Sequence, residues 1–287
     1  MTRFGRWTHT LLCTCLLVLP RAVCAQGEPA RRDSVPLRTR SDAHAAGALV
    51  AASAILFTAD ERIAHWMQRP ALQRKRSLDR TATTFEWIGG PGAFVLPATA
   101  LVLGKLGHDR RTTDVALHTG TSVLLAAGLT QAIKRTIGRA RPYVVHDSDA
   151  FDVKFGRGFT RGEAYRSFPS GHATAAFATA TALVAESQRW WPKRTRVIAP
   201  IAYGAATLVG VGRVFHDKHW ASDVVMGAAV GTLTARTVVR WQHAHPRNTI
   251  DRLLGAGTTS VSAVPAPGGT MIAITLPFPR YARRLFP

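Results

Sequence analysis

Cysteine is scarce in this chain of 287 residues, and its three copies, Cys13, Cys15 and Cys24, all lie near the beginning. Disulfide bonds and cysteine-ligated metal sites are therefore excluded from the rest of the chain. Acidic residues are also few, because 17 Asp and Glu stand against 37 Lys and Arg, which gives a net charge of +20. This imbalance favours anionic partners, such as phosphorylated substrates or anionic lipid headgroups.

Motifs that bind metals or nucleotides are missing as well. The sequence has no HExxH pair, no P-loop and no carboxylate cluster with metal-ligand spacing. We therefore expect no metal and no cofactor. No nucleic-acid-binding module is recognisable either, so nucleic acid is not an expected partner despite the positive charge.

The first 44 residues differ in character from the rest. Residues 1–25 combine early arginines, a short apolar run and a small-residue cleavage site, the pattern of a secretory signal peptide. The apolar run is too short to cross a bilayer, which needs about 20 residues. Residues 26–44 are polar, rich in Arg and interrupted by Pro, which is typical of a linker. We expect cleavage after Ala25 and a protein that works outside the cytoplasm, on the periplasmic side.

From residue 45 onward the sequence is helical in character, rich in Ala, Leu and Val. The expected helices cover residues 45–67, 77–87, 92–106, 112–138, 172–191, 196–215 and 221–241. This pattern predicts an all-α fold, a bundle of about six core helices within a domain spanning 45–245. In the tail, 246–287, two short alternating runs around a Pro-Gly-Gly turn predict a β-hairpin.

The apolar runs leave two environments open. Ala, Gly and Thr suit close helix packing in lipid, and they suit a tightly packed soluble bundle equally well. We expect a bundle embedded in the inner membrane, because the runs near 93–106 and 115–133 approach spanning length. A soluble periplasmic bundle is the alternative. The number of spans and the oligomeric state stay open.

Topology constrains these alternatives. If every later apolar run crossed the membrane after a cleaved signal peptide, Lys134 would face the cytoplasm. An extracytoplasmic site therefore requires one of three conditions: the run 45–59 is not a span, the bundle is soluble, or the signal peptide is retained. The positively charged loops do not decide between them, because basic residues occur on both sides.

Three polar segments interrupt the helical pattern. They are KRTIGRARP (Lys134–Pro142), PSGH (Pro169–His172) and GRVFHDKHWASD (Gly212–Asp223). In this order and spacing they resemble the three-part signature of the type-2 phosphatidic acid phosphatase superfamily. That superfamily includes bacterial lipid phosphatases, class A acid phosphatases and vanadium haloperoxidases. The resemblance covers about residues 113–240.

The resemblance implies a phosphate-binding set of three cations and a helix start. Its members are Lys134, Arg141, Ser170, Gly171 and Arg213. Fixed donors of this kind stabilise the charge that spreads over the oxygens of a transferred phosphoryl group. No metal is required, because the three cations take its place.

The resemblance also implies catalytic roles for three residues. His219 would attack phosphorus, and Asp223, four residues on, would lie on the same helix face and hold the imidazole ring. His172 would protonate the leaving alcohol and then activate water. The implied activity is a metal-independent phosphatase that acts through a phosphohistidine on a phosphomonoester or diphosphate. A lipid phosphate such as polyprenyl diphosphate or phosphatidic acid fits the apolar helices and the positive charge.

Other functions remain as alternatives. The same chemistry would serve a soluble periplasmic acid phosphatase of broad specificity or a vanadate-dependent haloperoxidase. A non-catalytic protein that binds anionic lipid would show salt-dependent binding that is indifferent to His172 and His219.

Residues around the motifs have simpler interpretations. Taken alone, Ser170 is a helix cap and Arg213 a cation at a helix end. Arg139 is expected to be solvated, and Trp220 to pack near the pocket mouth. Gly212 stands where the superfamily usually has Ser, which removes one hydroxyl near the phosphate.

Two segments are expected to be loops. One is the interior of the third motif, His216–Lys218. The other is residues 143–168, a mixed segment whose length is typical of a functional lid. Its aromatic side chains would contact a lipid tail or anchor the loop to the bundle.

Overall fold

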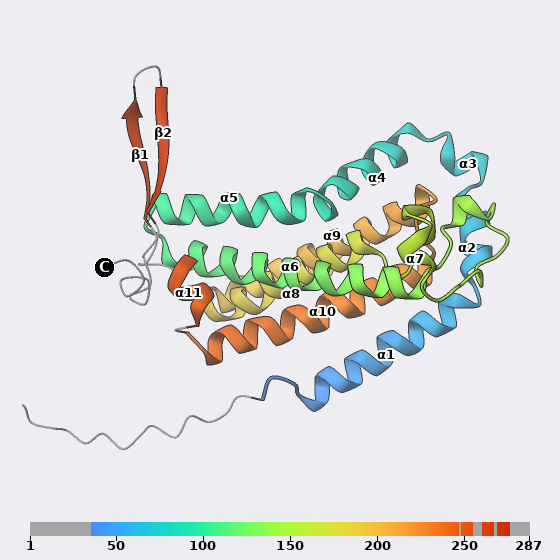
Figure 1. Cartoon of the computed structure of the whole chain (residues 1–287), viewed down its shortest axis with the longest axis horizontal. Coiled ribbons are helices and arrows are strands. Elements are labelled where there is room, and N and C mark those ends of the chain that lie inside the picture. The colour runs from blue at the N-terminus through green and yellow to red at the C-terminus, as the bar shows by residue number, and fades with distance from the viewer. Residues whose placement is uncertain (1–35, 247, 255–259, 267–268, 276–287) are drawn as a thin grey trace, which may run out of the picture. The chain divides into compact units, whose positions relative to one another are not determined.

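The computed structural model describes residues 36–246, 248–254, 260–266 and 269–275 and is mostly helical (Figure 1). The expected signal peptide, 1–25, lies outside these residues. In chain order the helices are α1 (Arg40–Phe57), α2 (Asp60–Met67), α3 (Pro70–Gln73), α4 (Arg76–Gly89), α5 (Gly92–Leu106), α6 (Arg110–Ile137), η1 (Pro142–Val144), α7 (Arg157–Thr160), η2 (Glu163–Tyr165), α8 (Gly171–Trp190), α9 (Pro192–Phe215), α10 (Ala221–Ala244) and α11 (Thr249–Leu254). The mostly helical fold expected from the sequence is confirmed.

Helix α8 is the centre of the bundle. It packs against α6, α9 and α10, while α10 also packs against α1 and α6 packs against α5. Small residues make these approaches possible. A Cβ added at Gly227 would come within 2.6 Å of the Ser170 carbonyl oxygen, and one at Gly231 within 2.2 Å of the Thr174 carbonyl oxygen. The backbones of α8 and α10 are therefore in direct contact, a geometry that small residues four apart permit.

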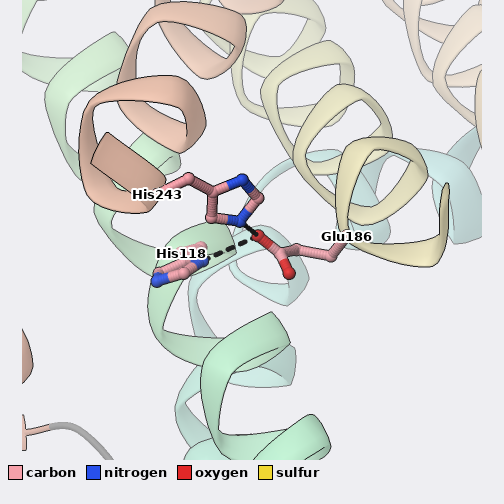
Figure 2. Close-up of side chains that lie close together, drawn as sticks. All are labelled: His118, Glu186 and His243. Carbon is pink, nitrogen blue, oxygen red and sulfur yellow. Dashed lines mark hydrogen bonds and ion pairs between the residues drawn. The ribbon is translucent and has the colours of Figure 1, made fainter. Parts of the chain in front are cut away.

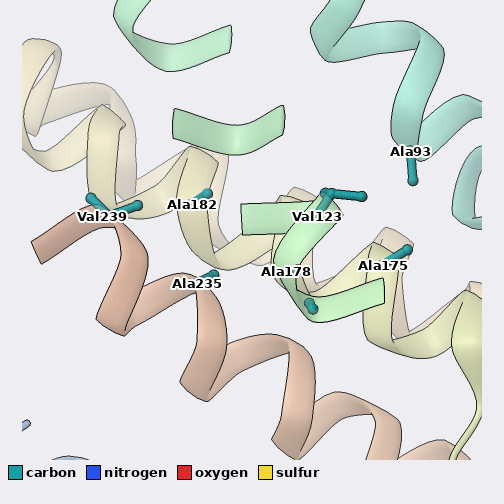
Figure 3. Close-up of a cluster of buried hydrophobic side chains, with 8 residues drawn as sticks. Ala93, Val123, Ala175, Ala178, Ala182, Ala235 and Val239 are labelled. Atoms are coloured by element: carbon teal, nitrogen blue, oxygen red, sulfur yellow. The ribbon is translucent and has the colours of Figure 1, made fainter. Parts of the chain in front are cut away.

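The core at these crossings consists of alanine and valine (Figure 3). Its buried members are Ala93, Val123, Ala126, Ala175, Ala178, Ala182, Ala235 and Val239. Their short side chains keep α6, α8 and α10 close together. Such packing leaves little freedom for the helix ends, where polar residues gather.

The single helix expected over 45–67 is wrong. The chain bends by 69° between α1 and α2, and the Thr58 hydroxyl donates to the Ile55 carbonyl at 2.8 Å where α1 ends. Helix α1 also begins at Arg40, inside the segment expected to be a linker. A capping box explains that start, because the Asp42 carboxylate accepts from the Thr39 N–H at 2.8 Å.

Two strands follow the helices. β1 (Ser260–Ala266) pairs antiparallel with β2 (Gly269–Thr275), with Ser260 opposite Thr275 and Ala266 opposite Gly269. Residues 267 and 268, between them, lie outside the described part of the chain.

One described helix, α9, is long and apolar enough to cross a membrane, with a mean hydropathy of 1.5. Up to three spans result if the bent pairs α1–α2 and α4–α5 each count as one. Large apolar side chains are exposed along several helices, among them Phe94, Val95, Leu96, Leu103, Leu124, Leu125, Leu129, Val197 and Ile201. The described helices thus present apolar surface on α5, α6 and α9.

Candidate active site

The three motifs meet because the helices that carry them run in opposite directions. Helices α6 and α9 end at the site, with Lys134 and Arg213 in their last turns. Helices α8 and α10 begin there, with His172 and Asp223 in their first turns, and His219 lies in the loop between α9 and α10. The structure therefore brings the predicted residues together at one end of the bundle.

His219 is buried, with 2% of its surface exposed. Its Nδ1 lies 3.5 Å from Asp223 Oδ2, and its backbone N–H donates to the Arg213 carbonyl at 3.3 Å. Burial lowers the pKa of His219 well below its usual value, and the positive charge of Lys134 lowers it further. The ring is therefore neutral near pH 7, the state that a nucleophile requires.

Asp223 is fully buried and joins the second and third motifs. Its Oδ2 accepts from the Ser167 hydroxyl and, at 3.0 Å, from the Trp220 N–H. Its backbone carbonyl accepts from the Ser170 N–H at 2.9 Å. The carboxylate that faces His219 is thus held rigidly by its own hydrogen bonds.

The expectation that Arg139 is solvated is wrong. Its side chain is 1% exposed, and its guanidinium donates to Asp223 Oδ1 at 2.6 Å, to Asp60 Oδ2 at 2.7 Å and to the Ala150 carbonyl. The same group lies 4.0 Å from the centre of the Phe57 ring. Arg139 is a buried counter-ion that links two carboxylates, because a fork of donors satisfies both at once.

Asp60 is a further buried residue that sequence reasoning missed. It accepts from the Ser222 backbone N–H at 2.9 Å and from the Ser222 hydroxyl, next to Asp223. It lies on α2, 163 positions before Asp223, so no local pattern in the sequence pairs the two. Its place directly after the apolar run of α1 is the only signal the sequence offered.

Residues predicted to bind phosphate lie around the start of α8. Ser170 is the N-cap, and its hydroxyl accepts from the Ala173 N–H at 3.4 Å, which confirms the cap interpretation, while its role in phosphate binding stays a prediction. A Cβ at Gly171 would lie 3.6 Å from Lys134 Cε. The Lys134 ammonium donates to the Ser167 carbonyl at 3.3 Å. The lysine and the free N–H groups of a helix start therefore lie side by side, which suits an anion.

Arg213 pairs with an acid that the sequence did not single out. Its Nη1 donates to Glu86 Oε1 at 2.5 Å, and Glu86 also lies 2.9 Å from His216 Nδ1. The Arg213 Nε is buried and has no hydrogen-bond partner among the described residues. One edge of the guanidinium is thus held by Glu86, while Nε is available to a ligand.

Arg141 is held in place by Glu163. Its Nε donates to the Glu163 carbonyl at 2.8 Å and its Nη2 to the Glu163 carboxylate at 3.2 Å. Glu163 lies in η2, within the segment expected to be a loop. That segment therefore positions a cation of the site.

His172 lies against the turn between α4 and α5. A Cβ at Gly90 would come 2.8 Å from His172 Nε2, so only glycine allows this approach. Burial lowers the pKa of His172 to about 4, and the nearby charge of Arg213 contributes. The ring is therefore a neutral base near pH 7 when no anion is bound.

Three further expectations are resolved by burial. Trp220 does not lie at a pocket mouth, because it is fully buried and its indole N–H donates to the Ala140 carbonyl at 3.0 Å. Segment 143–168 is not simply a solvated loop, since Asp147 and Ala150 are buried within it. Residues 216–218 do form the loop expected of them.

Gly212 has a packing explanation. A Cβ at this position would lie 3.2 Å from the Ala82 carbonyl oxygen, where α9 crosses α4. A serine Cβ would be a tight contact to which the α4 backbone would have to adjust slightly, so the departure from the usual signature goes with the close approach of these two helices.

Comparison with known proteins agrees with this geometry. A family model described as the PAP2 superfamily matches residues 115–247, which contain all three motifs. Residues 115–247 belong to the PAP2 superfamily. The PAP2 segment begins within α6, whereas Asp60, Glu86 and Gly90 precede it. The helices before the PAP2 segment therefore complete its site.

Several curated proteins resemble the chain. A lipid A 1-phosphatase of Porphyromonas gingivalis is 31% identical over 130 residues, which cover 45% of this chain and 24% of that protein. A lipid A 1-phosphatase of Rhizobium etli is 38% identical over 113 residues, 39% of this chain and 43% of that protein. Phosphatidylglycerophosphatase B of Bacillus subtilis is 27% identical over 186 residues, which cover 61% of this chain and 79% of that protein. The chain spans less than half the length of the first two relatives.

A solved structure is also similar. It is described as a transmembrane PAP2 type phosphatidylglycerolphosphate phosphatase from Bacillus subtilis. The match has a TM-score of 0.49 and 25% identity, and it covers 72% of this chain and 96% of the other.

Proposed function

We propose that this chain is a metal-independent phosphatase that hydrolyses a lipid-borne phosphomonoester or diphosphate through a phosphohistidine. The observation that carries the proposal is the buried, neutral His219 ring beside the Asp223 carboxylate, inside a PAP2 segment. The names of the relatives, lipid A 1-phosphatase and phosphatidylglycerophosphatase B, support a lipid substrate.

The first step forms the covalent intermediate. The Asp223 carboxylate, 3.5 Å from Nδ1 of His219, favours the proton on Nδ1, so the lone pair of Nε2 attacks phosphorus and the bond from phosphorus to the leaving oxygen breaks. His172 gives its proton to that oxygen. Without substrate the pKa of His172 is about 4, chiefly because of burial, and the negative charge of a bound phosphate raises the pKa toward the protonated form.

The second step restores the enzyme. His172, now neutral, takes a proton from water, and the resulting hydroxide attacks phosphorus. The bond between phosphorus and Nε2 of His219 breaks, and inorganic phosphate leaves. In both steps Lys134 and the unpartnered Nε of Arg213 stabilise the charge on the phosphoryl oxygens.

We place the site at a membrane surface, on the extracytoplasmic side. The exposed apolar side chains of α5, α6 and α9 support contact with lipid. Segment 143–168 contains Glu163, which accepts a hydrogen bond from Arg141. The same segment carries three exposed phenylalanines, Phe151, Phe155 and Phe159. Such side chains suit a membrane interface, where a lipid substrate keeps its tail in the bilayer. The catalytic domain then covers residues 45–245 together with the first turn of α1.

The test uses full-length protein purified in detergent with EDTA present and p-nitrophenyl phosphate as substrate. We expect activity in EDTA, and a loss of at least about 1,000-fold in His219→Ala because the nucleophile is removed. The matched control is His65→Ala, an exposed histidine on α2, which keeps full activity. Loss of wild-type activity in EDTA, or full activity in His219→Ala, contradicts the proposal.

A second variant tests the intermediate. The substrate p-nitrophenyl phosphate has a good leaving group, so the His172→Ala variant still forms the phosphohistidine. The variant lacks the base that activates water for the second step, so an acid-labile phosphoprotein accumulates. A panel of phosphatidic acid, polyprenyl diphosphate and lipid A, each in mixed micelles, then identifies the lipid class. Preference for soluble phosphomonoesters over every lipid contradicts the assignment to lipid substrates.

A further inference from the structure

A second polar cluster lies at the other end of the bundle and has no part in the chemistry above. It consists of His118 on α6, Glu186 on α8 and His243 on α10 (Figure 2). Glu186 Oε1 is 2.7 Å from His118 Nδ1 and 2.6 Å from His243 Nε2. These three atoms all lie within 4.8 Å of one another. Three helices thus direct two imidazole nitrogens and one carboxylate at a common point.

Several buried polar atoms around this point lack partners. Glu186 is fully buried, yet its Oε2 has no hydrogen bond within the described chain. Gln242 is 1% exposed, and neither atom of its amide has a partner among those same residues. Buried polar atoms are almost always satisfied, so each exception needs a ligand or an explanation. These exceptions gather beside the His–Glu–His cluster.

A cavity opens next to the cluster. It has a volume of about 180 Å³, and its lining includes His118, His243, Gln242 and Asp251. Asp251 Oδ1 lies 3.8 Å from His118 Nε2. The cavity gives an ion a route to the cluster, and a carboxylate on the far nitrogen of a ligating histidine orients its ring.

The surrounding charges favour a cation over an anion. The carboxylates of Glu186, Asp251 and Asp114 lie in or beside the cavity, whose lining also includes Arg110 and Arg189. Arg110 pairs with Asp114 at 3.6 Å. Three acids therefore face two guanidinium groups, and Glu186, the most deeply buried of the three, lies between His118 and His243.

We propose that His118, Glu186 and His243 bind a zinc ion. Two imidazoles and one carboxylate are a ligand set that zinc accepts, with a fourth position left for water or for Asp251. The imidazole nitrogens then turn from the carboxylate oxygen to the metal, and Glu186 Oε2 gains a ligand.

Zinc binding raises the stability of the fold and takes no part in phosphate hydrolysis. His118 and Lys134 lie 16 residues apart on α6, about 24 Å along the helix axis. The ion would join α6, α8 and α10 at the end of the bundle opposite the three motifs. EDTA therefore lowers the melting temperature and leaves turnover at low temperature intact.

The experiment measures zinc binding to the full-length protein in detergent. The protein is stripped with EDTA, titrated with zinc chloride by calorimetry, and assayed for metal content after gel filtration. We expect one zinc per chain and a rise in melting temperature with zinc. Cobalt substitution should give visible ligand-field absorption. Wild-type protein that retains no stoichiometric zinc overturns the proposal without reference to any variant.

Variants then assign the ligands. His243→Ala and Glu186→Gln should weaken zinc binding by at least about 10- to 100-fold and abolish the rise in melting temperature. The matched control is His245→Ala, an exposed histidine at the same helix end, which binds zinc as wild type does. Helical circular dichroism and hydrolysis of p-nitrophenyl phosphate establish that each variant is folded. Folded ligand variants that bind zinc as tightly as wild type contradict the assignment.

Discussion

At the scale of single residues, the site depends on a chain of buried charges. His219 faces Asp223, Asp223 is bound by Arg139, and Arg139 also binds Asp60. A buried charge is tolerated only when it has a partner of opposite charge. Removal of one residue of this chain leaves a neighbouring charge buried without its partner, and the desolvation cost of that charge is then uncompensated. Under the proposed mechanism Arg139 acts as a positioning residue, two contacts away from His219.

We predict that Arg139→Met destabilises the protein by about 3 to 5 kcal/mol, because two buried carboxylates lose their counter-ion. The midpoint of denaturant unfolding measures this change. The activity that remains should show an altered pH profile, since an unbalanced Asp223 raises the pKa of His219. Arg161→Ala, at an exposed arginine of segment 143–168, serves as control, and equal stability of both variants would contradict the role.

A second residue-scale prediction concerns Asp217, in the loop before His219. Burial raises the pKa of Asp217 to about 7, and the neighbouring Asp147 carboxyl contributes. The folded state therefore binds more protons than the unfolded state, so stability is complete below about pH 4 for this group and falls as pH rises through 7. In Asp217→Asn this dependence is removed. Unfolding measured at pH 5, 6, 7 and 8 should give a flatter curve for the variant, and identical slopes would refute the assignment.

At the scale of elements, glycines decide which helices touch. Gly231 on α10 lies against the Thr174 carbonyl of α8, whereas an added Cβ at Gly128 on α6 meets no atom within 4 Å among the described residues. The two positions have the same residue type in the same kind of helix. Only the tertiary contact separates them.

We predict opposite effects of the same substitution at these two glycines. Gly231→Ala should destabilise by about 1 to 3 kcal/mol, because α8 and α10 must separate. Gly128→Ala should stabilise by up to about 1 kcal/mol through helix propensity. Thermal unfolding in detergent measures both. A shift of the same sign in the two variants would mean that the contact between α8 and α10 is not tight.

At the scale of the whole molecule, the apolar surface and the site belong to one arrangement. Helices α5, α6 and α9 expose large apolar side chains, and segment 143–168, whose Glu163 accepts from Arg141, exposes phenylalanines. A lipid substrate would reach the site along this surface while its tail stays in the bilayer.

We predict that Phe155→Ser combined with Phe159→Ser lowers activity on phosphatidic acid in vesicles by about tenfold, because interfacial anchoring is lost. Hydrolysis of p-nitrophenyl phosphate should be unchanged, since both side chains are exposed, Phe155 at 80% and Phe159 at 62%. A parallel fall on both substrates would indicate damage to the site itself. Phe85→Leu, at a partly buried position, controls for loss of an aromatic ring.

The sequence by itself determined most of the long helices and the residue types of the predicted site. Apolar runs gave the expected span of α5, residues 92–106, and three short motifs supplied Lys134, His172, Arg213, His219 and Asp223. Helix ends carry local signals, namely caps, glycines and charges, so their positions follow from neighbouring residues.

Only the tertiary structure decided which distant residues meet. Asp60 and Glu86 reach the site from helices far earlier in the chain. The Arg139 side chain is buried because two buried carboxylates, Asp60 and Asp223, pair with its guanidinium. His118, Glu186 and His243 are single residues on three helices, with no spacing that links them. Long-range pairing of buried charges depends on how helices cross, and helix crossings are set by packing over the whole bundle.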